Sequence, residues 1–256
     1  MTAIKKAGYL IMIIMALLAG MLLVSCGQEG GAEKDEGVSI EEGWTIRDDG
    51  SAYTYAVVIE NTTEDKIIRK VNVNVDALDP DGNIIEKKED YKGAYYMIGP
   101  IWPGRKGTFT MPYTEIDDEV FNEWDEMPSG FSIKANVTER TPIESSGADD
   151  LEKASPDIEV VSAEEIFNDG ETAEYWITLK NNGKYDCEAD FTGANSAIPD
   201  LSVIFRNEDG EITGSGIPLI EMEGDILAIP AGEEVSVDVN IFNMPPGEPE
   251  FCFSWQ

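Results

Sequence analysis

The chain has 256 residues, with 51 acidic side chains against 18 Lys and Arg and no His at all. The formal net charge of −33 argues against nucleic acid as a partner, because such binding depends on Lys and Arg meeting phosphate. Without His the chain lacks the commonest general base and the usual zinc ligand. We therefore expect no cofactor and no nucleic-acid partner.

The N-terminus has the parts of an export signal. Two lysines precede an uncharged run, residues 7–24, and the small Ser25 precedes Cys26. A charged start, an apolar core and a small residue before the cut form a secretory signal peptide. "LVSC" also resembles the lipobox of bacterial lipoproteins, in which the cysteine is acylated and becomes the first residue. The resemblance predicts residues 1–25 as a lipoprotein signal peptide and Cys26 as the site of lipid attachment.

The leader also predicts where the protein lies. The body is expected outside the cytoplasm, lipid-anchored to the cell membrane of a bacterium, most readily of Gram-positive type. Two alternatives stay open: an uncleaved anchor, since about 18 apolar residues can just cross a bilayer, and a cleaved signal without lipid. Residues 26–43 are rich in Gly and Glu, which predicts a flexible acidic tether.

The body shows the two-residue period of β-strands. Apolar and polar residues alternate in "VNVNVDAL" (71–78), "FSIKANVT" (131–138) and "VSVDVNIF" (235–242). Such alternation is typical of antiparallel sheet with one face in a core. Only the acidic stretch 115–127 has a helix-like composition, and we expect a brief helix there. Many short strands separated by turn residues predict an all-β protein of sandwich type.

The body also repeats itself. "YAVVIENTTEDK" (55–66) corresponds to "YWITLKNNGKYD" (175–186), and "DPDGN" (79–83) corresponds to "NEDGE" (207–211). Each Asp-Gly pair predicts a tight turn rather than a calcium loop. The repeat predicts two tandem β-sandwich domains, residues 44–140 and 158–256. The polar, aperiodic stretch 141–157 is expected to be the linker.

One segment of the repeat resembles a known module. In "VDALDPDGNII" (75–85), Val75, Ala77, Leu78 and Asp79 stand at the signature positions of FxLYD-type domains. The resemblance implies immunoglobulin-like sandwiches on a bacterial surface lipoprotein. It implies no catalytic residues.

Two cysteines of the second half form a candidate disulfide, Cys187 with Cys252. Disulfides persist outside the cytoplasm, which favours the bond. The alternation of neighbouring side chains argues against it, because Cys187 is expected to point into the core and Cys252 away from it. Both outcomes stay open.

An aromatic stretch in the first half, residues 93–104, is a candidate binding patch. Its Tyr95, Tyr96 and Trp102 could form an exposed surface for a partner, since aromatic side chains anchor interfaces. The alternative is that these side chains fill the core of the sandwich.

The function that these features favour is a non-enzymatic binding or interaction module on the cell surface. Its ligand would be a surface protein, a peptide or a glycan. The runner-up is a passive structural spacer. A hydrolase that uses paired carboxylates is a distant third, because close acidic pairs arise by chance in so acidic a chain.

The first testable prediction concerns Cys26. Mass spectrometry of the protein isolated from its native membrane should find an acylated Cys26 as the first residue. Cys26→Ala should abolish the acylation. An unmodified N-terminus at any other residue would contradict the prediction.

Overall fold

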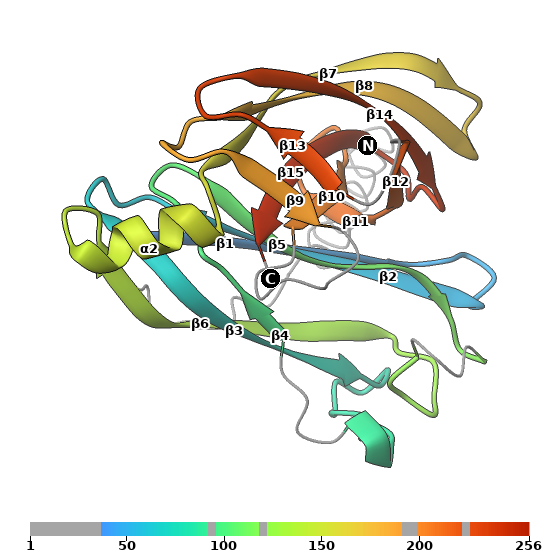
Figure 1. Cartoon of the computed structure of the whole chain (residues 1–256). Helices are drawn as coiled ribbons and strands as arrows, with labels where there is room; N and C mark the ends of the chain where they lie inside the picture. Colours follow the sequence, from blue (N-terminus) through green and yellow to red (C-terminus); the bar gives the residue numbers. More distant parts are fainter. Residues whose placement is uncertain (1–36, 92–95, 118–121, 191–198, 222–225, 256) are drawn as a thin grey trace, which may run out of the picture. The chain divides into compact units, whose positions relative to one another are not determined.

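The computed structural model describes residues 37–91, 96–117, 122–190, 199–221 and 226–255. They belong to one compact unit, Lys34–Gln256, and they confirm an all-β, sandwich-like fold of antiparallel sheets (Figure 1). The predicted signal peptide and Cys26 lie outside the described residues. Within the described part of the chain, no helix combines the length and apolarity needed to cross a membrane.

Two three-stranded sheets make up the described part of the first half. One has the order β1-β2-β5, and the other has the order β4-β3-β6. Their strands are β1 (Val38–Ile46), β2 (Ala52–Asn61), β3 (Lys66–Leu78), β4 (Tyr96–Ile98), β5 (Lys106–Glu115) and β6 (Gly130–Pro142), with a short 3₁₀ helix η1 (Glu89–Tyr91) between β3 and β4.

In the second half, the residues that the structure describes form three sheets. Their orders are β12-β14-β8-β7, β11-β10-β15 and β13-β9. The strands are β7 (Ile158–Asn168), β8 (Thr172–Asn181), β9 (Cys187–Asp190), β10 (Pro199–Arg206), β11 (Ile212–Ser215), β12 (Ile217–Glu221), β13 (Ile226–Ile229), β14 (Glu234–Phe242) and β15 (Glu248–Trp255).

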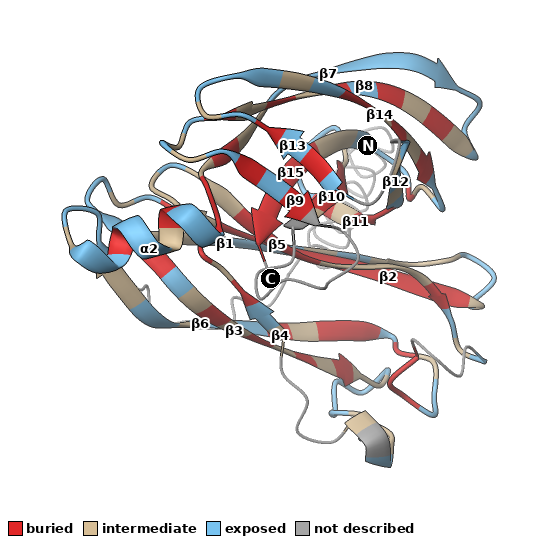
Figure 2. Ribbon diagram, viewed as in Figure 1, coloured by how far each residue is buried: buried red, intermediate tan, exposed pale blue. Residues whose placement is uncertain are grey.

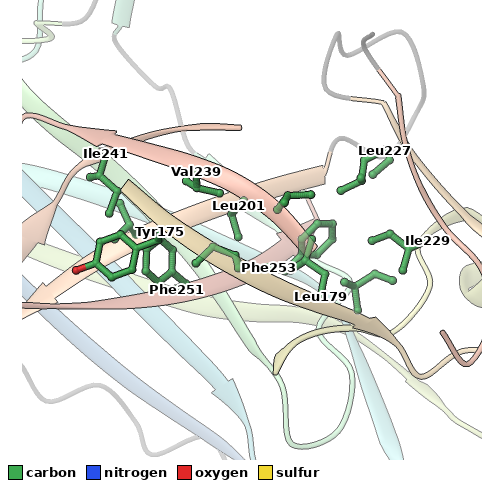
Figure 3. Packing of buried hydrophobic residues seen from close by; sticks show 14 of the residues in the cluster. Tyr175, Leu179, Leu201, Leu227, Ile229, Val239, Ile241, Phe251 and Phe253 are labelled. Carbon is green, nitrogen blue, oxygen red and sulfur yellow. The ribbon is translucent and has the colours of Figure 1, made fainter. Parts of the chain in front are cut away.

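The alternating strands bury the faces that the sequence predicts. On β3, all four predicted inward residues, Val71, Val73, Val75 and Ala77, are fully buried in the first core. On β14, Val237, Val239 and Ile241 enter the core of the second half. There they pack with Tyr175 and Leu179 of β8 and with Phe251 and Phe253 of β15 (Figure 3).

The two halves repeat the same hydrogen bonds. The side chain of Asn61 donates to the carbonyls of Lys66 and Ile101 at 2.8 and 2.9 Å. The side chain of Asn181 donates to the carbonyls of Tyr185 and Ile229 at the same two distances. Each asparagine therefore ties the end of its strand to the start of a proline- and glycine-containing turn, which leads into β5 in the first half and into β14 in the second.

The Asp-Gly turns also match. Asp79 accepts from the backbone of Asp81 and Asn83, and Asn207 accepts in the same way from Asp209 and Glu211. The glycine that follows has a φ of 81° at position 82 and 82° at position 210. These positive φ angles suit glycine, and the predicted turns are confirmed.

The two halves meet through the back of β2. The strand is buried on both faces (Figure 2): Tyr53, Tyr55, Val57 and Ile59 enter the first core, and Ala56 and Val58 pack against Ile204 and Ile212 of the second half. Thr54 lies on the same back face and donates to the Ser215 carbonyl at 3.3 Å. A strand covered on both sides explains why "YAVVI" runs apolar without alternation.

A polar contact borders this apolar one. The Glu250 carboxylate binds Lys106 of the first half, and it also accepts from Arg206 at 2.6 Å. Arg206 in turn binds Glu41 of β1 at 2.6 Å. Burial raises the pKa of Glu250, but the hydrogen bonds from Lys106 and Arg206 outweigh it and leave the pKa below its ordinary value. The carboxylate is therefore ionised within the contact.

Three expectations about local structure need correction. The tether does not extend to residue 43, because β1 begins at Val38 and pairs with β2. The helix predicted over 115–127 is wrong in its described part: β5 runs to Glu115, and Trp124 forms a β-bridge with Lys87. The stretch 141–157 instead contains a helix, α2 (Ser146–Ala154). Whether the halves are separate domains stays a prediction.

The second testable prediction concerns Gly43 in β1. A Cβ at this position would lie 1.9 Å from the backbone oxygen of Ile212, so Gly43→Ala should force the two halves apart. We expect a loss of about 1–3 kcal/mol, as for overpacking, and a melting temperature lower by roughly 2–12 °C. Gly147→Ala is the control, because its nearest neighbour would be 3.8 Å away. Equal melting of both variants would contradict the contact.

Candidate functional site

A groove of about 520 Å³ lies where several strands of the second half begin or end. Its walls come from the end of β7, the start of β8, the end of β10 and the loop from β14 to β15. We call it the Tyr175 groove, and its lining includes Glu165, Asn168, Tyr175, Phe205 and residues 244–249.

The loop after β14 forms a rigid wall of the groove. Pro245 and Pro246 have fixed φ angles, and the Pro246 carbonyl accepts from Thr213 at 2.6 Å. Gly247 has a φ of 134°, and a Cβ there would lie 2.4 Å from the Arg206 oxygen. Only glycine fits this approach, so the sequence "PPG" positions the wall before any ligand arrives.

Glu165 is the best-organised polar group of the groove. Its Oε2 accepts from the Tyr175 hydroxyl at 2.8 Å and from the Asn168 side chain at 3.0 Å. The hydrogen bond from Asn168 and then that from Tyr175 lower the pKa of Glu165. Burial, the hydrogen bond to Glu165 and the charges of Glu165 and Glu248 raise the pKa of Tyr175. The pair is therefore a neutral phenol and an ionised carboxylate.

This arrangement suits the binding of a cation. Among the described residues, the hydrogen bonds of the Glu165 carboxylate both go to Oε2, so Oε1 is available to a positively charged group. A glycosidase would need one carboxyl with a raised pKa to act as general acid, and the pKa of Glu165 is shifted the other way. No three His, Cys, Asp or Glu side chains of the described residues group as metal ligands.

The two candidate disulfide cysteines are buried, separate thiols. Cys187 packs in the second core. Cys252 lies on β15 between the core residues Phe251 and Phe253 and pairs with Ser202. Ser202 accepts a hydrogen bond from Thr108 of the first half at 2.9 Å, so this face points toward the first half. Burial raises the pKa of each thiol to about 12, which makes both poor nucleophiles. The alternation argument against the bond agrees with this placement.

The two described residues of the candidate aromatic patch, Tyr96 and Trp102, are both half-buried. Tyr95 lies outside the described residues. Tyr96 is half-buried and stacks on Phe109 with ring centroids 4.0 Å apart. Trp102 is also half-buried and donates from Nε1 to the Ser155 carbonyl at 3.0 Å. The structure places neither ring on an open surface, and a binding role for this stretch stays a prediction.

Sequence reasoning missed the groove entirely. Its components, Glu165, Tyr175 and the segment 244–249, come from separate parts of the sequence, and each has an ordinary role by itself. The loop "NMPPGEP" was the available signal, because two prolines and a glycine directly after an alternating strand indicate a fixed, non-repeating connection.

Comparison with known proteins gives no family. No protein-family model matches the chain, and no curated protein matches it. Among solved structures, it is similar to a transglutaminase of red sea bream, with a TM-score of 0.26 and 9% identity over 87% of this chain. The match spans 29% of the transglutaminase, and a likeness at this level carries no argument about function.

The third testable prediction separates packing from binding at Trp102. Because the ring is half-buried and hydrogen-bonded to Ser155, Trp102→Ala should lower the stability by about 2 kcal/mol. The melting temperature should fall by roughly 4–8 °C. Trp102→Phe keeps a ring without the donor and should lose less. A Trp102→Ala variant that melts like the parent chain would contradict the packing role.

Proposed function

We propose that the chain is an exported, lipid-anchored binding protein that holds a positively charged segment of a partner in the Tyr175 groove. The body is attached through Cys26 to the outer side of the cell membrane, and its action is binding without catalysis or cofactor. The halves 44–140 and 158–256 correspond in this proposal to two tandem immunoglobulin-like domains, as the FxLYD resemblance implies.

The observation that carries the proposal is the fixed carboxylate of Glu165. Tyr175 and Asn168 hold one of its oxygens, so the side chain loses little freedom when a ligand binds. Hydrogen bonds between a carboxylate and a charged donor are stronger than neutral ones. Glu248 lies on the same groove and adds a second negative charge.

Among protein, peptide and glycan ligands, the apolar lining of the groove favours a basic peptide. Phe205, Met244 and Pro245 give the groove surfaces that suit methylene groups. Lys and Arg place apolar stems along such surfaces while their charged ends reach polar groups. A neutral sugar would use the lining but not the charge.

Two other functions remain alternatives. A passive spacer is the runner-up, and it would have no ligand for the groove. A carboxylate hydrolase is a distant third, and the lowered pKa of Glu165 disfavours this residue as its general acid.

The fourth testable prediction uses a capped heptapeptide of alternating Lys and Val, with Gln in place of Lys as the matched neutral peptide. Calorimetry on the full chain in neutral detergent should detect the Lys peptide, with affinity that falls as salt is added. Glu165→Gln should weaken binding by about two- to fivefold, as expected for an exposed ion pair.

The control variant is Glu144→Gln, which makes the same charge change at an exposed residue outside the groove. It should bind the Lys peptide like the parent chain. Equal binding of the Lys and Gln peptides, or equal weakening by both substitutions, would overturn the proposed role of Glu165. No binding of either peptide would favour the spacer.

A further inference from the structure

Strand β7 is an exposed edge of its sheet. It is the last strand in the order β12-β14-β8-β7, and among the described residues it pairs only with β8. From Val161 to Asn168 every residue is exposed, which Figure 2 shows along most of the strand. Unpaired backbone groups on such an edge can form hydrogen bonds with another chain.

The edge carries glutamates, but it lacks the basic residues and the proline that commonly protect edges. Strand β6, which also ends its sheet, carries Lys134, Arg140 and Pro142. Strand β7 contains no Lys, Arg or Pro. Its irregularities are two register shifts, one between Val160 and Ser162 and one between Glu165 and Phe167. Between the shifts, residues 162–165 keep continuous pairing with β8, and Phe167 and Asn168 pair with it again beyond the second shift.

The outer face beside this edge combines aromatic and acidic side chains. Trp176 is 54% exposed and lies opposite Glu164 on β7 and Asp238 on β14. Phe167 is 50% exposed and lies opposite Glu174. Acids next to an exposed indole favour a cationic partner, because the carboxylates and the ring face both attract positive charge.

The inner face of the same strand contributes to the Tyr175 groove. Glu165 pairs with Tyr175 in the β7–β8 register, and its side chain lines the groove. The next residue toward the N-terminus, Glu164, lies opposite the outward Trp176. Successive side chains of β7 thus carry carboxylates to both faces.

We propose that β7, from Ser162 to Asn168, accepts an extended, positively charged segment of another protein as an added strand. Alternate side chains of that segment enter the Tyr175 groove, and the others lie along Trp176 and Phe167. This mode of recognition takes affinity from backbone hydrogen bonds and specificity from alternate side chains. The inference rests on the proposed function and specifies its mode of binding.

Charge selects this occupant over two others. A second copy of the chain would bring Glu164 and Glu165 against another acidic surface, and each chain has a formal net charge of −33. The chain's own segment 27–36 carries four acids and one lysine, so it would be repelled as well. A basic segment of a partner meets attraction on both faces.

The test uses the capped Lys-Val heptapeptide and two N-methylated versions, one methylated at every Val and one at every Lys. In an extended strand, alternate amides point to the same side, so each version blocks one edge of the peptide. On the full chain in neutral detergent, we expect one version to lose at least about tenfold in affinity and the other to bind within about twofold of the parent.

A second readout comes from amide hydrogen exchange of the same full-chain sample. Binding of the unmethylated peptide should slow exchange within residues 162–168, because an added strand bonds the outward amides of β7. Exchange in β6 should not change. Slowed exchange together with loss for only one N-methylated peptide supports strand addition.

Three results would overturn the inference. If the parent peptide binds in a Glu165-dependent way but both N-methylated versions bind equally, the groove is correct and strand addition is wrong. Unchanged exchange in residues 162–168 on binding would also show that it is wrong. If the parent peptide does not bind at all, the proposed function fails together with the inference.

Discussion

The contact behind β2 is the constraint on which the rest of the described structure depends. A strand buried on both faces must satisfy two cores with alternating residues, so Tyr55 and Val57 serve one core while Ala56 and Val58 serve the contact. The approach is close: a Cβ at Gly214 would lie 2.4 Å from Thr54. Because such tight packing tolerates little change in volume, the small residues of β1 and β11 fix how the two β layers meet.

The same contact has a polar border, and this border makes it depend on pH. The pKa of Glu250 is lower in the folded chain than its ordinary value of 4.5, so the unfolded chain binds the proton more readily. The stability that Glu250 contributes is therefore present above its ordinary pKa and is lost as the pH falls through the folded value. The apolar part of the contact consists of Ala56, Val58, Ile204 and Ile212. None of these side chains titrates, so its contribution does not change with pH.

Local sequence patterns predicted the strands and turns correctly, but they did not predict features formed where segments distant in the sequence meet. The alternation in β3 and β14 placed the inward residues correctly, and the Asp-Gly turns formed as expected. The sequence did not predict the helix Ser146–Ala154, because its amphipathic pattern is short. A residue distant in sequence helps to hold the helix in place: the backbone N–H of Lys184 donates to the Glu152 side chain at 2.8 Å. The Tyr175 groove was not predicted for the same reason, since Glu165 and the segment 244–249 are far apart in the sequence.

The strong negative charge of the chain explains how the edge of β7 can be exposed without pairing with another copy. An edge of this length that is apolar in part, through Val161 and Ile166, would ordinarily promote pairing between copies. Paired glutamates at 164 and 165 oppose that pairing, since like charges directly opposite one another destabilise a sheet. The same carboxylates attract a basic strand, so one feature both discourages self-association and selects a partner. The repulsion between copies and the attraction of a basic strand both come from exposed carboxylates. Both therefore weaken together as salt screens the charges.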